Sequence, residues 1–590
     1  MPVRSPAASP ATTPTARFGW LAALATAFSA LVYINALDNP FVYDDFRTVL
    51  NNPSIEDIWE VSAIVYREMT RPVVNFSYAV DRAISGGSLL GYHVTNVLLH
   101  VLNVLLLFQI ARRSVEDQVA RMAAISGRLP VRGTVVAFTA AATFGLHPMM
   151  TEAVGYISGR SEVLCGAFFL AALLAARRWL LGAGRAWLVL AFGLWIGSLL
   201  SKEIGAIWPL VLLGYDRLVI AGDREHSRRR WRRVLGPLLG LTVLAGVVRV
   251  AVLVLVENPG GAEIIWRYGL VEVEVMFRYF SLLLSPADQS IFHQVSEVSW
   301  PPAPRMILAL IWLGAWLGTA WRLARLDGAV TLGMVWFVLL LVPSSVLVLL
   351  NLGEPMAEHR VYLAAAGFFL ASGTIVGHVW AFFDTRTPRS RLLLRFSLAA
   401  WLTVLGGLTV LRNEVWSDPV RLWLDAAEKA PDIWVPHVML GSALQERGAR
   451  EEAIVAYRRA IRLRPSEQAA YMRLGLAQAE LGRLPDARAT FQTLLTLDPT
   501  SVVGHNGLGA VALLEHKPED ARRHYEDALA HHPNDLAARQ SLAMLYETVW
   551  QNPGEALRLC EEVRRMAPRT QDIDACIERN RARLKDSPSH

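Results

Sequence analysis

The sequence predicts an all-α protein in which a bundle of membrane-spanning helices precedes a tail of helical repeats. Of the 590 residues, 53% are hydrophobic and only 19% are charged, and long apolar runs recur through the first two thirds of the chain. A soluble globular protein carries about 25% charged residues. The low charge content therefore indicates a polytopic membrane domain over 18–412, followed by a soluble tail over 413–585.

The N-terminal region has two parts. Residues 1–17 are rich in Pro, Ala, Ser and Thr, a composition typical of a disordered arm. The apolar stretch that follows, 18–37, is longer than the roughly 7–15 residues of a signal-peptide core. We therefore expect a retained anchor helix rather than a cleaved signal.

Long apolar stretches follow one another through the membrane domain, and a helix needs roughly 20 mostly apolar residues to cross a bilayer. Eleven stretches meet or approach this length: 18–37, 93–111, 133–147, 154–176, 186–201, 204–220, 234–256, 305–324, 329–351, 361–383 and 393–411. A twelfth, 268–285, contains Glu272, Glu274 and Arg278. Because each charge near the bilayer centre costs about 2.5–3.5 kcal/mol, we expect this stretch to be re-entrant or interfacial.

Basic residues predict the orientation, since cytoplasmic loops carry an excess of Lys and Arg. With eleven crossings, all basic clusters fall on one side: Arg4 and Arg17, 112–132, 177–185, 224–233, Arg322 and Arg325, and 386–395. The N-terminus is then cytoplasmic. The tail and two long outer loops, 38–92 and 257–304, face the other side. An Arg- and Ala-rich composition favours a bacterial inner membrane with a periplasmic tail; a eukaryotic chain would have luminal repeats in the endoplasmic reticulum.

The tail repeats with a period of 34 residues. Prolines, small residues and aromatics each keep this step: Pro431, Pro465, Pro499 and Pro533; Gly441, Gly475 and Gly509; Tyr457, Phe491 and Tyr525. This is the period of the tetratricopeptide repeat, a helix pair whose small residues allow close approach. We expect a curved solenoid with a concave binding groove, or else a plain scaffold without a peptide ligand. Cys560 and Cys576 could form one disulfide, but nothing in the sequence requires it.

Polar residues gather in the predicted outer turns, each of which carries both acidic and basic side chains. Ionisable groups at membrane depth are candidates for function because their desolvation must be offset. Purely structural roles stay open for individual residues. Lys202 and Glu203 could anchor a helix end, His147 could mark the end of a helix, and Asp44 with Asp45 could form a solvated cap. The candidate site residues are Asp44, Asp45, Arg71, His147, Glu152, Arg160, Lys202, Glu203, Glu358, His359 and Arg360.

The sequence lacks the motifs of several enzyme classes. No glycine-rich nucleotide fingerprint follows a strand, and no P-loop, HExxH or paired CxxC is present. We therefore expect no cofactor, no metal and no nucleic-acid partner. An enzyme outside the cytoplasm has no ready supply of nucleotide donors. A polyprenyl-phosphate sugar dissolved in the membrane meets this need, because its phosphate lies at the headgroup level.

Transfer of such a sugar to a hydroxyl group needs two kinds of side chain. A carboxylate takes the acceptor proton as general base, and cations hold the leaving phosphate as its charge develops. Asp44 or Asp45 fits the first role, and Glu152 and His147 are expected to shape the sugar pocket. The candidates for the phosphate are Arg71, Arg160, Lys202 and Arg360.

Six sequence blocks carry a family resemblance. In chain order they are "FVYDDFRTVLNNPSI", "RPVVNFSYAVD", "GYHVTNVLLHVLNVLLLF", "HPMMTEAVGYISGRSEVL", "LLSKEIGAIWPLVLLGYD" and "MAEHRVYLAAAGF". With the trailing repeats they resemble the transmembrane and tetratricopeptide-repeat-containing (TMTC) O-mannosyltransferases, members of the GT-C class of glycosyltransferases. The resemblance spans residues 18 to about 570, although the repeat array is shorter than in animal members.

The resemblance implies a GT-C membrane fold and a polyprenyl-phosphate-linked donor, with mannose as the family's default sugar. It implies an inverting, metal-independent transfer to Ser or Thr of a protein acceptor bound through the repeats. It also implies that an acidic residue of the first outer loop acts at the catalytic centre, which falls on Asp44 and Asp45. Two alternatives stay open: a non-catalytic envelope scaffold, and a GT-C enzyme acting on a glycan or lipid.

Overall fold

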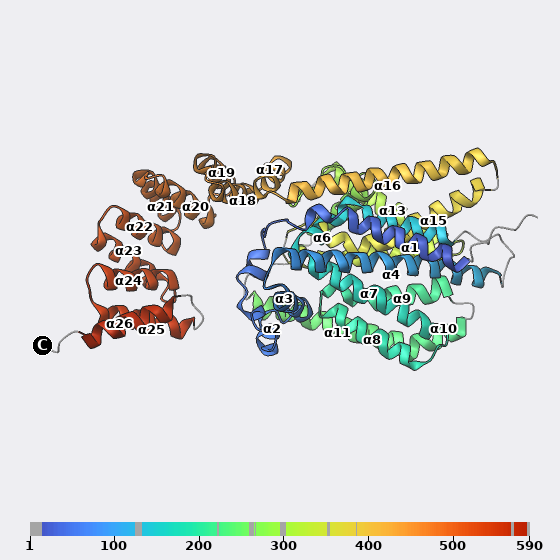
Figure 1. Cartoon of the computed structure of the whole chain (residues 1–590), viewed down its shortest axis with the longest axis horizontal. Coiled ribbons are helices and arrows are strands. Elements are labelled where there is room, and N and C mark those ends of the chain that lie inside the picture. The colour runs from blue at the N-terminus through green and yellow to red at the C-terminus, as the bar shows by residue number, and fades with distance from the viewer. Residues whose placement is uncertain are drawn as a thin grey trace, which may run out of the picture. The chain divides into compact units, whose positions relative to one another are not determined.

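A computed structural model describes residues 14–123, 133–220, 224–258, 265, 267–295, 303–350, 354–384, 386–567 and 572–586. These residues form helices and connecting turns, and no strand occurs among them. They divide into two compact units, Met1–Asp418 and Pro419–His590, shown in Figure 1. The predicted all-α fold is confirmed. Most of the expected N-terminal arm lies outside the described residues, and the first helix begins at Pro14.

The first unit contains the predicted membrane helices together with the shorter helices between them. In chain order they are α1 (Pro14–Leu31), α2 (Val61–Arg67), α3 (Pro72–Ser85), α4 (Leu89–Ala123), α5 (Gly133–Leu146), α6 (Thr151–Gly155), α7 (Arg160–Leu180), α8 (Arg185–Leu199), α9 (Trp208–Gly214), α10 (Arg224–Arg230), α11 (Gly236–Val252), α12 (Tyr268–Leu284), α13 (Pro304–Leu323), α14 (Gly328–Leu349), α15 (Tyr362–Asp384) and α16 (Pro388–Trp416). Eight helices of the described part are long and apolar enough to cross a membrane. The other three predicted spans correspond to the shorter α5 and α8, and to α9 with its helical continuation to Ile220.

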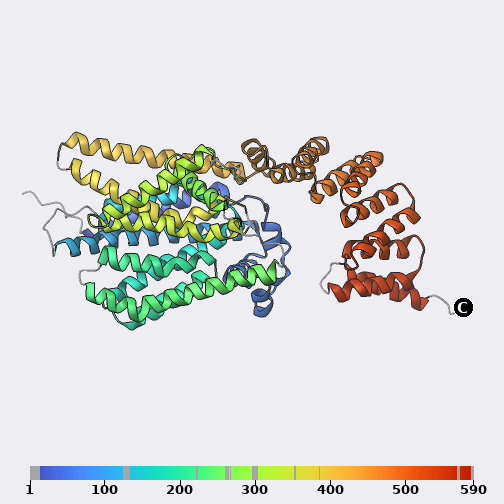
Figure 2. The ribbon, with the colours of Figure 1, turned by 180° about the vertical axis from the view of Figure 1, so that it is seen from behind.

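The two ends of this bundle differ in composition. Figures 1 and 2 show α2 and α3 at one end and the arginine-rich α10 at the opposite end. We call the end with α2 and α3 the outer end. It includes the ends of α5 and α8 and the starts of α7 and α15. Hydrogen bonds join these segments, for example from Val73 N to Leu200 O at 3.3 Å and from Tyr78 Oη to Ile157 O at 3.1 Å.

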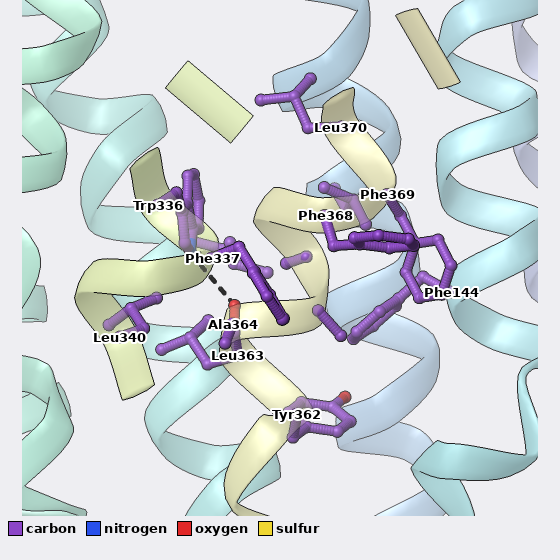
Figure 3. Packing of buried hydrophobic residues seen from close by; sticks show 14 of the residues in the cluster. Phe144, Trp336, Phe337, Leu340, Tyr362, Leu363, Ala364, Phe368, Phe369 and Leu370 are labelled. Carbon is purple, nitrogen blue, oxygen red and sulfur yellow. Dashed lines mark hydrogen bonds between the residues drawn. The ribbon is translucent and has the colours of Figure 1, made fainter. Parts of the chain in front are cut away.

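Close packing of α14 against α15 fixes the start of α15 at the outer end. A Cβ added to Gly333 would lie 2.4 Å from the Gly367 carbonyl oxygen, and one added to Gly367 would lie 2.6 Å from Trp336. Small residues allow such close approach between membrane helices. Trp336 Nε1 donates to Leu363 O at 3.0 Å across this contact, in the aromatic cluster of Figure 3.

The stretch expected to be re-entrant or interfacial forms α12, and both of its ends contact the outer end of the bundle. Before α12, Ile265 N donates to Leu349 O at 2.9 Å, where α14 ends. Near its other end, Tyr279 Oη donates to Ala357 O at 2.6 Å, and Leu283 O accepts from His147 Nε2 at 3.1 Å. The re-entrant or interfacial position of α12 stays a prediction.

The second unit is a stack of helix pairs. Its helices are α17 (Pro419–Lys429), α18 (Trp434–Glu446), α19 (Arg450–Leu463), α20 (Gln468–Glu480), α21 (Leu484–Leu497), α22 (Val502–Leu514), α23 (Pro518–His531), α24 (Leu536–Thr548), α25 (Pro553–Met566) and α26 (Ile573–Asp586). The repeat pattern is explained by packing within each pair. A Cβ added to Gly475 would lie 2.3 Å from the Phe491 ring, and Gly441 and Gly509 meet Tyr457 and Tyr525 in the same way. The predicted repeat architecture is confirmed.

A disulfide joins Cys560 of α25 to Cys576 of α26 across a sequence separation of 16. The sequence left this pairing open. Closing a loop of this length stabilises a folded state by about 3 kcal/mol. We therefore expect Cys560→Ser to lower the unfolding free energy of the tail by about 2–4 kcal/mol, measured by urea-dependent proteolysis of the full chain without reductant. As a control, reductant should bring the wild type down to the variant's stability. Equal stabilities without reductant would contradict the pairing.

Candidate active site

The Asp44–Asp45 pair lies in a strained turn between α1 and α2. Tyr43 has a left-handed backbone with a φ of 49°, a conformation that costs a non-glycine residue about 1–2 kcal/mol. Its hydroxyl donates to Oε1 of Glu354 at 2.9 Å, and its ring packs edge-on against Phe292 at 5.8 Å. These contacts fix the turn against segments far away in the sequence. Such strain is concentrated at functional sites.

The two aspartates have different surroundings. Asp45 is fully buried, and its carboxylate accepts from Ser158 N at 2.8 Å, Ser158 Oγ at 2.6 Å and Val42 N at 3.2 Å. Burial raises the pKa of Asp45 to about 7, although the Ser158 hydrogen bonds oppose this shift. Asp44 is exposed, and its carboxylate accepts no hydrogen bond from the residues that the structure describes. Asp45 therefore holds the turn, and Asp44 is available to a substrate.

Acidic side chains near the start of α15 surround the Tyr43 contact. Glu354 accepts the hydrogen bond from Tyr43. Burial raises the pKa of Glu354 to about 7; the charges of Glu152 and Asp44 add to this shift, and the charge of Arg360 opposes it. These electrostatic interactions place Asp44 and Glu152 near Glu354. Arg360 donates to the Glu354 carbonyl at 2.7 Å and is only partly buried.

Two predicted carboxylates are held by histidines. Glu152 accepts from Nδ1 of His359 at 2.5 Å, and burial raises the pKa of Glu152 to about 8. Glu358 lies 2.9 Å from Nε2 of His293 and accepts from the backbone N of Ser290 at 2.7 Å. Both pairs join the start of α15 to other outer segments. They fix the shape of this end of the bundle.

Arg160 does not have the surroundings predicted for it. It is fully buried, and it forms an ion pair with Asp81. Its Nε donates to Asn96 at 2.7 Å, its second terminal nitrogen donates to Tyr92 O at 2.6 Å, and it lies 4.8 Å from the centre of the Tyr78 ring. Its donors are engaged, so a phosphate contact would require breaking a buried ion pair. Arg160 is better explained as a structural cation than as the predicted phosphate ligand.

The neighbouring residues Lys202 and Glu203 form ion pairs with different partners. Lys202 is buried and lies 2.5 Å from Glu162 at the start of α7, an ion pair like that of Arg160. Glu203 is half exposed and accepts from Arg71 at 3.2 Å. Burial opposes ionisation of Glu203, but the charges of Arg71 and Lys202 outweigh it and lower its pKa. Lys202 is therefore held by a buried carboxylate, whereas Arg71 is half-buried and pairs with the more exposed Glu203.

His147 is likewise held by contacts within the protein. Its ring is fully buried, and both nitrogens bond to the backbone: Nδ1 accepts from Met149 N at 3.2 Å, and Nε2 donates to Leu283 O at 3.1 Å. These contacts cap the turn after α5 and tie it to α12. This geometry favours a role for His147 in ending a helix over a contact with the sugar.

A small polar pocket of about 50 Å³ lies beside the aspartates. Three arginines line it, together with hydroxyls and amides: Arg47, Arg67, Arg71, Thr48, Ser158, Ser161, Asn52 and Asn75, with Glu68 the acidic member. Thr48 links the pocket to the aspartates, because its Oγ1 donates to Asp44 O at 2.9 Å. The exposed guanidinium of Arg67 has no ion pair among the described residues. The site residues predicted from the sequence did not include Arg47 and Arg67. The signal that could have found them is their place in a loop predicted to face away from the cytoplasm, where the positive-inside rule disfavours arginine.

Fold and site define a polytopic helical membrane protein with a charged outer end and a tetratricopeptide-repeat tail. The tetratricopeptide-repeat family profile matches residues 438–502. The chain is 27% identical to the protein O-mannosyl-transferase Tmtc1 of Drosophila melanogaster, covering 76% of this chain and 62% of that protein. It is 24% identical to the protein O-mannosyl-transferase F38B6.6 of Caenorhabditis elegans, covering 74% of this chain and 62% of that protein.

Human protein O-mannosyl-transferase TMTC1 is 23% identical over 76% of this chain and 56% of its own length. The chain thus spans less than two thirds of the length of these curated relatives. The predicted resemblance to the TMTC O-mannosyltransferases is confirmed. Among solved structures, the thermophilic repeat protein TTC0263 of Thermus thermophilus is 20% identical with a TM-score of 0.26, covering 30% of this chain and 94% of that one. MamA is 20% identical with a TM-score of 0.22, covering 25% and 85%.

Proposed function

We propose that this chain is an integral-membrane glycosyltransferase that moves a sugar from a polyprenyl-phosphate donor to a Ser or Thr hydroxyl of a protein. The observation that carries the proposal is the exposed Asp44, held in a strained turn beside an arginine-lined pocket at the outer end of the bundle. The curated relatives named protein O-mannosyl-transferases support the same reaction and favour mannose.

The aspartates take separate roles in this proposal. Asp44 accepts the proton of the acceptor hydroxyl, whose oxygen forms the new bond to the sugar C1 while the bond from C1 to the donor phosphate breaks. Asp45 is a positioning residue, because its buried carboxylate is occupied by Ser158 and Val42. Asp45 keeps the turn that carries Asp44, together with Ser158, in place next to the acceptor.

The leaving phosphate is assigned to the arginine-lined pocket. Its charge develops as the bond to C1 breaks, and guanidinium groups bind phosphate oxygens in pairs. Arg67 is exposed, and Arg71 is half-buried beside the more exposed Glu203, so both are able to reach a ligand. Arg160 and Lys202 are instead held by buried carboxylates. Arg360, whose guanidinium donates to a backbone carbonyl, is a further cation at this end.

The pocket assignment predicts the behaviour of Arg67→Gln. A charge-assisted hydrogen bond contributes about 1.5–3 kcal/mol, so we expect the KM for the lipid-linked donor to rise about 10–100-fold, measured by initial rates against donor concentration. The control is Arg82→Gln, a cation of α3 that pairs with Glu56 outside the pocket. Equal effects of the two substitutions would argue against a phosphate site here.

The basic clusters and the tail support the proposed compartment. Disulfides persist in oxidising compartments and are rare in the cytosol, so the Cys560–Cys576 bridge supports a tail outside the cytoplasm. The contacts of both ends of α12 with the outer end support its not crossing, which keeps the predicted orientation consistent. In this orientation the repeats face the same compartment as Asp44 and bind the acceptor segment.

A reconstituted reaction tests the function. The purified chain in detergent receives polyprenyl-phosphate mannose and a Ser/Thr-containing peptide, and the products are followed by mass spectrometry. We expect mannosyl-peptide and free polyprenyl phosphate in equal amounts, since one bond forms for each that breaks. A chain that binds the peptide through its repeats without consuming donor would be a scaffold. Transfer to an added glycan or lipid in preference to the peptide would also contradict the proposal.

A further inference from the structure

Three metal-ligand side chains meet in the tail, away from the candidate active site. His505 lies on α22, and His524 and Asp527 lie one turn apart on α23. One donor atom from each lies within 4.8 Å of the others. The spacing of His524 and Asp527, three residues apart, places both on one face of α23, toward the helix that carries His505. None of these residues has a role in the function proposed above.

The hydrogen bonds of His505 determine which ring nitrogen is available. Its Nε2 donates to the Pro499 carbonyl at 3.1 Å, which leaves Nδ1 with a lone pair. Nδ1 lies 4.0 Å from Oδ2 of Asp527. The Nδ1 atoms of both His505 and His524 are buried and have no hydrogen-bond partner among the described residues. A carbonyl on the far nitrogen is the arrangement that orients metal-binding histidines in proteins.

The repeat itself provides an internal comparison. His437 lies 68 residues before His505, two periods earlier, and its Nε2 donates to Pro431 O at the same 3.1 Å. That hydrogen bond is therefore a feature of the repeat. The positions two periods before His524 and Asp527 hold Ala456 and Arg459. The earlier repeat thus has the oriented histidine without the other two ligands, and places a cation where the carboxylate stands.

We propose that His505, His524 and Asp527 form a binding site for a first-row divalent transition metal ion, of which Zn²⁺ is the best match. Two imidazoles and one carboxylate are a donor set typical of zinc, with bond lengths of about 2.0–2.2 Å. Tetrahedral ligands are then roughly 3.4 Å apart. Asp527 is exposed, so its side chain is able to close the gap to His505. The ring of His531, stacked on His505 at 5.7 Å, or a water completes the coordination.

The site would cross-link the two helices of one repeat. This differs from the expectation that the chain holds no metal, which rested on the absence of HExxH and CxxC motifs. The inference is independent of the sugar-transfer reaction, because it concerns residues of the second unit alone. Loss of transferase activity would leave it standing.

Cobalt binding to the full chain tests the site. The chain is purified in detergent with a histidine-free affinity tag and titrated with Co²⁺, whose visible absorption reports four-coordinate nitrogen and oxygen ligands. We expect one Co²⁺ per chain, displaced by an equivalent of Zn²⁺. His524→Ala and Asp527→Asn should each weaken binding by roughly tenfold or more. His437→Ala is the matched control and should leave binding unchanged.

Two results would overturn the proposal. One is a wild type with no saturable absorption; the other is binding that survives His524→Ala and Asp527→Asn. If a histidine variant fails to fold, Asp527→Asn still tests the site. Asp527 is exposed and the substitution keeps the shape of the side chain, so the fold should be unaffected. A gain of function extends the test: Ala456→His with Arg459→Asp should raise the stoichiometry to two Co²⁺ per chain, and a stoichiometry that stays at one would count against the assigned ligands.

Discussion

Asp44→Asn is expected to lower the rate of sugar transfer by about 10²–10⁴-fold, the range that a general base contributes. The amide keeps the size of the side chain and removes the group that accepts the proton. Asp44 is exposed and its carboxylate accepts no hydrogen bond within the described part of the chain, so the fold should be unaffected. The measurement is single-turnover transfer from lipid-linked mannose to a peptide, with the melting temperature recorded beside it.

The matched control for Asp44 is Asp38→Asn, an exposed aspartate of the same outer loop. It should keep near-normal activity. Asp45→Asn should act differently, because this buried carboxylate accepts three hydrogen bonds that hold the turn. We expect it to lower both the melting temperature and the activity. Near-normal transfer by Asp44→Asn would remove the assigned base and with it the proposed mechanism.

Arg160→Met is expected to lower the unfolding free energy by about 3–5 kcal/mol, since it leaves the buried Asp81 carboxylate without its counter-charge. The change also removes the hydrogen bonds to Asn96 and to the Tyr92 carbonyl. The measurement is thermal unfolding of the purified chain in detergent. If Arg160 instead contacted the donor phosphate, the variant would keep its melting temperature and show a raised KM for the donor.

A second variant separates the ion pair from other effects of Arg160→Met. Replacing a buried ion pair by apolar residues of similar size is often nearly neutral. Arg160→Met combined with Asp81→Leu should therefore recover much of the lost melting temperature. If the double variant is no more stable than Arg160→Met alone, the ion pair is not the cause of the loss.

Much of the fold follows from local sequence patterns. The 34-residue period predicts the tail because each repeat packs mainly against its neighbours, as the contact of Phe491 with Gly507 of the next repeat shows. Apolar stretches predict the membrane helices because their length alone is informative. The lengths of α5 and α8 fall short of full spans, since helix ends in a bundle are set by packing and not by hydropathy.

The candidate site was predictable as a region but not as a set of contacts. The distribution of basic residues predicts which turns face the same side of the membrane. Asp44, Glu152 and Arg360 could therefore be assigned to one end of the bundle. The individual contacts could not be predicted, because Arg160 pairs with a residue 79 positions away and Tyr43 bonds to one 311 positions away. Without those partners, a buried structural arginine and a ligand-binding arginine look alike in sequence.

The central claim is that the aspartate turn and the repeat tail share one compartment, opposite the arginine-rich end. Membrane-impermeant maleimide labelling of intact cells tests it, with single cysteines introduced into a cysteine-free chain. We expect Ser88→Cys, between α3 and α4, and Ala530→Cys, on α23, to be labelled from outside the cytoplasm. Ala183→Cys, between α7 and α8, should react only after permeabilisation. Labelling of Ala183→Cys in intact cells, or opposite responses of the first two sites, would contradict the account.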